Sequence, residues 1–111
     1  MVFDIALGCC FVGLPLFPMA GVAEGFIEGD LDFHLALAEA AGNPLILSLI
    51  DSIVGLLREQ RMRTYYIDGG PERGQYHHKR ILEAIERSDA QGARDAMCAH
   101  LRQVREDSAQ T

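Results

Sequence analysis

Four polar residues lie on predicted helix faces whose other members are apolar: Asp30, His34, His78 and His100. Asp30 and His34 are four residues apart, and on a helix that spacing places both side chains on one face. His78 and His100 each fall in register with the aliphatic residues of their own segments. His77 is turned by about 100° from His78 on a helix, so we expect it to face solvent.

Imidazoles and carboxylates on buried faces favour a shared metal site. An unpaired buried imidazole costs about 1–3 kcal/mol, and a buried charge costs more. Three imidazoles and one carboxylate on facing helices can converge on zinc, nickel, manganese or ferrous iron. Two simpler interpretations stay open, because a lone His on an apolar stripe is often a hydrogen-bonded core residue and an Asp near a helix start is often a cap. The sequence has no HExxH unit, so a small metalloenzyme is the weakest hypothesis.

The segments that carry these residues are predicted to be helices. An apolar stripe over residues 30–41 predicts a first helix that ends at Gly42, where the missing Cβ suits a left-handed residue. Asn43 is expected to cap a second helix that runs from Pro44 to about Tyr65. The apolar stripe of this second helix is unusually wide, which predicts burial on more than one side, in the centre of a bundle or at a subunit contact.

Two further helices follow a turn at residues 67–71. The third is expected from about Pro71 to Arg87, and the fourth begins at a capping box formed by Ser88 and Gln91. Residues 106–111 are polar and are expected to fray. Since no strand alternation follows residue 30 and the loops are short, the predicted fold is an all-α antiparallel helical bundle.

Composition and charge exclude several function classes. The chain has 111 residues, 49% of them hydrophobic and 23% charged, which fits one packed domain. No Lys or Arg precedes Arg58 and the net charge is −6, so nucleic-acid binding by this chain alone is excluded, because nucleic acid is bound by clustered cations. Cys9 and Cys10 are neighbours and Cys98 stands alone, so we expect no disulfide framework and a reducing, cytoplasmic location.

An uncharged stretch of 19 residues, 5–23, raises the question of a membrane segment. Pro15 and Pro18 interrupt it and no base flanks it, so we expect neither a signal peptide nor a membrane anchor. It is either an irregular apolar segment packed on the helices or an unnatural start, such as a frameshift. The predicted organisation is an irregular segment over 1–28, a helical metal-binding domain over 29–107, to which the resemblance described next adds effector binding, and a frayed tail over 108–111.

Four pieces of the sequence resemble one family. Asp30–His34 and Ala41–Leu45 resemble the D-x-x-F-H and N-P motifs of the C-terminal effector-binding (FCD) domain of FadR-type regulators in the GntR family. His78–Ile85 and Asp89–Leu101 are similar to the second half of that domain. The likeness covers roughly residues 28 to 107, and four loose pieces in the right order make it fairly specific.

The resemblance implies an antiparallel helical bundle that senses small metabolites, often carboxylates, and that tends to dimerise. In many members an Asp and three His bind a divalent metal beside the effector pocket, and by motif these are Asp30, His34, His78 and His100. Zinc is the first expectation, with nickel, manganese or iron as alternatives. Neither the family's winged helix-turn-helix domain nor the helices that precede its D-x-x-F-H motif are recognisable in this sequence, so we expect that this chain does not itself contain the DNA-reading domain.

The leading hypothesis is therefore a metabolite-sensing, metal-binding domain of a transcriptional regulator rather than an enzyme. Its expected partners are a small organic acid and a second copy of the chain, without a membrane. Arg61 is the expected cation for the effector carboxylate, with Arg58 behind it, although a solvated arginine at a helix end is the commoner role. The alternative is a truncated dimerisation or structural remnant with no ligand function.

Overall fold

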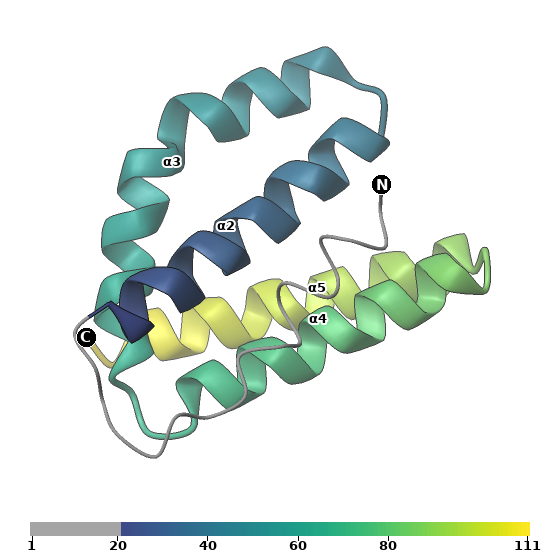
Figure 1. The fold of residues 1–111 in the computed structure, drawn as a ribbon. Helices are drawn as coiled ribbons and strands as arrows, with labels where there is room; N and C mark the ends of the chain where they lie inside the picture. The colour runs from purple at the N-terminus through teal and green to yellow at the C-terminus, as the bar shows by residue number, and fades with distance from the viewer. Residues whose placement is uncertain (1–20) are drawn as a thin grey trace. The chain divides into compact units, whose positions relative to one another are not determined.

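The computed structural model describes residues 21–111, and within this range every regular element is a helix. The all-α prediction is therefore confirmed. The described chain divides into two compact units, one ending at Met62 and the other spanning Arg63–Thr111. In chain order the helices are α2 (Val22–Ala40), α3 (Pro44–Tyr65), α4 (Gly70–Glu86) and α5 (Ala90–Ser108) (Figure 1).

Helix α2 begins earlier than its sequence pattern predicted. Gly21 has a φ of 102°, a left-handed conformation that favours glycine, and the helix starts at the next residue. The buried stripe already includes Ala23 and Ile27, which continue into Leu31 at helical spacing. The irregular segment predicted over 1–28 is thus wrong for residues 22–28, and its first 20 residues lie outside the described part of the chain.

The connection between α2 and α3 follows its predicted chemistry. Gly42 has a φ of 71°, and the side-chain oxygen of Asn43 accepts a hydrogen bond from the backbone N–H of Leu45 at 3.0 Å. The prediction of α3 from Pro44 to Tyr65 is confirmed.

The wide apolar stripe of α3 is not buried within the chain. Helix α3 contains no buried residue, and Leu45, Leu49 and Leu56 are 78%, 62% and 68% exposed. The central place in a bundle that the stripe suggested is therefore wrong for the described chain. The other predicted explanation, a subunit contact, stays a prediction.

Helices α4 and α5 form an antiparallel hairpin (Figure 1). Its core contains Ile81, Ala84 and Ala96. The cap of α5 differs from the prediction by one residue: the side chain of Asp89, not of Ser88, accepts the N–H of Gly92 at 2.8 Å. Ser88 instead takes a positive φ of 55° in the turn, so it cannot serve as the cap.

The end of α5 does not fray as predicted. The helix continues to Ser108, and Asp107 is buried against α4 through an ion pair with Arg73. The last described residues still make backbone hydrogen bonds, such as Gln110 N–H to the Asp107 carbonyl at 3.1 Å.

No helix in the range 21–111 combines the length and the apolar character that crossing a bilayer requires.

Candidate metal centre

Asp30 and His34 share one face of α2, as their spacing predicted. The Asp30 Oδ1 and His34 Nε2 atoms are 4.0 Å apart, and both side chains are largely buried. Asp30 lies well inside α2, between Val22 and Ala40, so the interpretation of Asp30 as a helix cap is wrong. The two residues present a carboxylate and an imidazole to the same point.

Arg61 of α3 binds the same carboxylate. Its Nε donates to Asp30 Oδ2 at 2.7 Å, and this pair is only 14% and 8% exposed. Burial lowers the pKa of His34 below its ordinary value of 6.5; the negative charge of Asp30 opposes this shift and the positive charge of Arg61 adds to it. His34 is therefore neutral at pH 7, the state in which an imidazole can bind a metal ion.

Arg58 lies apart from Asp30 and pairs with Glu28. Its Nε and Nη2 donate to the two Glu28 carboxylate oxygens at 2.6 and 3.2 Å, and the two side chains are 46% and 51% exposed. The hydrogen bond from Arg58 lowers the pKa of Glu28 below 4.5. Of the two arginines predicted for the effector, Arg61 thus contacts a predicted metal ligand, and Arg58 forms a surface ion pair.

His78 of α4 and His100 of α5 face each other inside the hairpin. They are 4% and 1% exposed, and their Nε2 atoms are 3.1 Å apart. Two imidazole nitrogens that bind one tetrahedral zinc at about 2.0–2.1 Å lie roughly 3.3 Å from each other. The pair therefore has the spacing of two ligands to one ion, and equally that of a histidine–histidine hydrogen bond.

A chain of polar contacts continues from His100 along α5 to α4. His100 Nδ1 is 3.2 Å from Gln103 Oε1, and Gln103 Nε2 donates to Asp107 Oδ2 at 2.5 Å. The other oxygen of Asp107 accepts from Arg73 Nη2 at 2.7 Å. The sequence analysis did not identify Gln103, Asp107 or Arg73 as members of this network, although the spacing of residues 100, 103 and 107 places the first two on the same helix face as His100.

His77 is not solvent-facing as predicted. It is half-buried, and its ring centroid lies 5.8 Å from that of His100. Its buried Nδ1 has no hydrogen-bond partner within the described residues, and burial lowers its pKa. The rings of His77 and His100 are tilted by 37° to each other, and no contact between their nitrogens is seen among the described residues. His78 and His100, in contrast, face each other through their Nε2 atoms.

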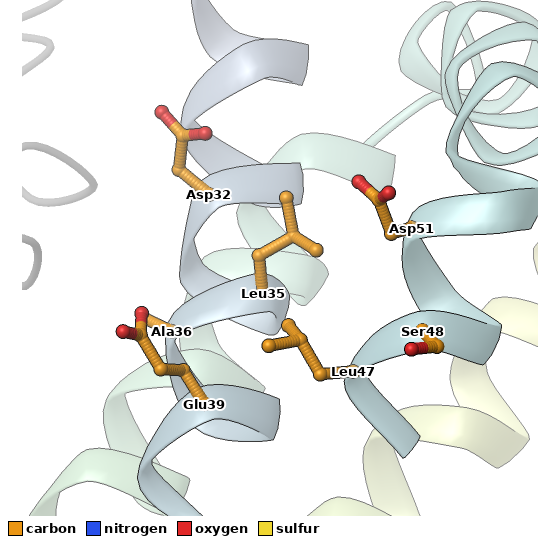
Figure 2. Close-up of a pocket in the computed structure, with 7 residues that line it drawn as sticks. All are labelled: Asp32, Leu35, Ala36, Glu39, Leu47, Ser48 and Asp51. Carbon is orange, nitrogen blue, oxygen red and sulfur yellow. The ribbon is translucent and has the colours of Figure 1, made fainter. Parts of the chain in front are cut away.

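An open cleft of about 600 Å³ lies between α2 and α3 (Figure 2). It is on the face of α2 that points away from Asp30 and His34. Three of its lining residues are acids, Asp32, Glu39 and Asp51, and none is basic. Figure 2 shows Leu35 and Leu47 between the two helices. Since carboxylates repel an organic acid, this cleft is unsuited to a carboxylate effector.

Comparisons with known proteins identify regulators. Residues 18–103 match the FCD domain. The chain is 35% identical over 78 residues to an Escherichia coli (strain K12) protein named as a regulatory protein of the L-lactate dehydrogenase operon. The aligned region covers 67% of this chain and 30% of that protein. It is 33% identical over 94 residues to the Uxu operon transcriptional regulator of the same organism, covering 79% of this chain and 37% of the relative.

A third relative is the HTH-type transcriptional regulator LutR of Bacillus subtilis (strain 168), 34% identical over 82 residues, with 69% of this chain and 37% of the relative covered. The chain thus spans about a third of the length of these curated relatives. No solved structure shows significant similarity to it. The relatives are regulators rather than enzymes, and the matched domain is their regulatory ligand-binding part. The chain belongs to the FCD domain family of GntR-type transcriptional regulators.

Proposed function

We propose that the chain is a metabolite-sensing domain in which Asp30, His34, His78 and His100 bind one divalent metal ion. The observation that carries the proposal is the burial of His78 and His100 with their Nε2 atoms 3.1 Å apart. That spacing suits two ligands of one ion.

The chemistry of the four donors supports the same proposal. Each residue offers one ligand atom, an imidazole nitrogen or a carboxylate oxygen, and three of the four are buried. Such donors suit zinc and the other first-row divalent ions, which bind neutral imidazole together with carboxylate. Because His34 is neutral at pH 7, no proton has to leave that imidazole before it binds the ion.

The coordination number decides what the ion does. Zinc with four protein ligands is complete in tetrahedral geometry and acts structurally. An ion that prefers six ligands, such as nickel, manganese or ferrous iron, keeps two positions beside the same four donors. We propose that a small organic acid uses these positions through its carboxylate. Arg61, which already donates to Asp30, is the cation assigned to the effector, while Arg58 is engaged with Glu28 at the surface.

The exposed apolar face of α3 favours a homodimer. Leu45, Leu49 and Leu56 remain in solvent in the single chain, and burying leucine side chains stabilises an association by about 1.5–3 kcal/mol each at most. A dimerisation domain without ligand function is the second candidate, because this face does not depend on the histidines. Metal analysis of the purified chain separates the two candidates, because a dimer that holds no stoichiometric divalent ion supports the second.

The direct test is metal binding by the purified chain. We expect about one divalent ion per chain by elemental analysis, and a lower melting temperature after treatment with a chelator. A ligand at about 100 times its Kd stabilises the folded state by about 2.7 kcal/mol. L-Lactate is the first effector to try, since one relative is named for the L-lactate dehydrogenase operon. Absence of a stoichiometric ion, together with no effect of the chelator, would contradict the sensor function.

A further inference from the structure

We infer that Gln103, held by Asp107 and Arg73, is a positioning residue that keeps the proton of His100 on Nδ1 and leaves Nε2 unprotonated toward His78. The tautomer follows from the hairpin alone. Its consequence for metal affinity rests on the function proposed above. All the residues involved lie on α4 and α5.

The argument starts at Asp107, the fixed end of the network. An ionised carboxylate only accepts hydrogen bonds, and Asp107 accepts from the Arg73 guanidinium at 2.7 Å. Asp107 is 4% exposed and the Arg73 side chain is 42% exposed, so this charge-assisted contact is partly buried, with the carboxylate as its buried end. Its second oxygen lies 2.5 Å from the side-chain amide of Gln103.

The acceptor character of Asp107 orients the amide of Gln103. Only the NH₂ group of an amide donates, so the atom that faces the carboxylate is Nε2 and the atom on the other side is Oε1. Gln103 Oε1 lies 3.2 Å from His100 Nδ1. An amide oxygen cannot donate, so Nδ1 of His100 carries the hydrogen.

The tautomer of His100 then determines the contact between the two histidines. In a neutral imidazole only one nitrogen is protonated, so the neutral form of His100 with its hydrogen on Nδ1 presents a lone pair at Nε2. That lone pair points at His78 Nε2, 3.1 Å away. Partners of this kind commonly fix the tautomer of metal-binding histidines. In this hairpin the partner is an amide, with the carboxylate one residue farther along the chain of contacts.

The chain offers a matched control on the same helix. Gln91 donates to Asp95 at 2.9 Å with the same four-residue spacing as Gln103 and Asp107, but this pair is exposed. Gln103→Met and Gln91→Met each remove one amide while keeping an unbranched side chain of similar size, so that both variants retain the helix. Thermal unfolding of the metal-free 111-residue chain verifies that both are folded.

The experiment measures the His100 tautomer in the metal-free chain by long-range ¹H–¹⁵N NMR, and the affinity for zinc by competition with a chelating dye. We expect Nδ1–H in the wild type and in Gln91→Met, and a shift toward Nε2–H in Gln103→Met. Zinc affinity should fall about 10- to 100-fold in Gln103→Met alone.

An Nε2–H tautomer in the wild type would overturn the inference, whether or not zinc binds. An unchanged tautomer, or an unchanged zinc affinity, in Gln103→Met would also overturn it. An Nδ1–H wild type that shifts in Gln103→Met but binds no zinc supports the assignment of the tautomer and contradicts only the proposed metal function.

Discussion

The two halves of the proposed metal site are built differently. On the α4–α5 hairpin, His78 and His100 are buried, and a polar network runs from His100 through Gln103 and Asp107 to Arg73. On α2, Asp30 accepts from Arg61, a cation that lies on a helix without any buried residue. The hairpin half has a polar network at one of its proposed ligands, His100, whereas the α2 half has a cation at its proposed carboxylate ligand, Asp30.

This difference predicts which changes affect the metal and which affect the protein without it. In the hairpin, a substitution removes a proposed ligand or the residue that orients it, so we expect the affinity for the metal ion to fall. At Asp30, removal of Arg61 leaves the carboxylate available to the metal ion. It also lowers the stability of the metal-free chain, because a buried charge without its partner is unfavourable.

Loss of an imidazole in the hairpin should have the largest effect. His78→Ala or His100→Ala is expected to abolish tight binding of a divalent ion, because each removes one of the four proposed ligands. His77→Ala, the matched control on the adjacent residue, should keep stoichiometric binding, since His77 meets His100 only through a tilted ring contact. Titration with zinc and isothermal calorimetry provide the measurement. If His77→Ala were the damaging change, the assignment of the α4 ligand would be wrong.

Arg61→Ala should affect the metal-free chain more than the loaded one. It breaks a largely buried ion pair with Asp30, for which about 3 kcal/mol of the free energy of unfolding is a reasonable expectation. A bound divalent ion supplies positive charge at the same carboxylate, so the increase in melting temperature on adding metal should be larger in Arg61→Ala than in the wild type. Arg61→Lys serves as a control that retains the charge. Equal metal-induced shifts in all three proteins would contradict the placement of Asp30 in the site.

Arg58→Ala should have the smallest effect, and the effect should depend on pH. The pKa of Glu28 lies below its ordinary 4.5 because Arg58 donates to it, so the pair stabilises the fold above pH 4.5 and loses this contribution as the pH falls through the lowered value. The pair is half-exposed and screened by solvent, so the melting temperature should drop only slightly at pH 7. Wild type and variant should converge well below pH 4.5. A difference that persisted there would assign another role to Arg58.

Local chemistry was predictable from the sequence where one residue type satisfies one backbone demand. Gly42 in a left-handed conformation, Asn43 as a cap and Pro44 at the first turn all follow from such demands, and the bounds of α3 follow with them. Predictions were wrong where two neighbours could meet the same demand. Ser88 and Asp89 are both good caps, and the backbone of the turn selects Asp89.

The candidate site was predictable in part for a similar reason. Helical spacing places Asp30 and His34 on one face and identifies His78 and His100 as buried, because these are properties of single helices. Asp107 lies in the polar segment that was expected to fray. It is buried and pairs with Arg73 of another helix, a contact that the pattern of a single helix does not predict. Ion pairs between helices, such as Arg61 with Asp30, depend on packing distances that a linear pattern does not contain.

Arg73 connects the polar network of His100 to the turn that precedes α4. Its Nη2 contacts Asp107, and its Nη1 donates to the backbone carbonyl of Asp68 at 2.9 Å, in the turn that precedes α4. Thermodynamic linkage is reciprocal. If an ion at His100 orders this network and the turn, the ion raises the affinity of the turn for any molecule that immobilises it. That molecule then raises the affinity for the ion by the same factor. The turn is thus a second location, remote from the imidazoles, where occupancy could be read out or controlled.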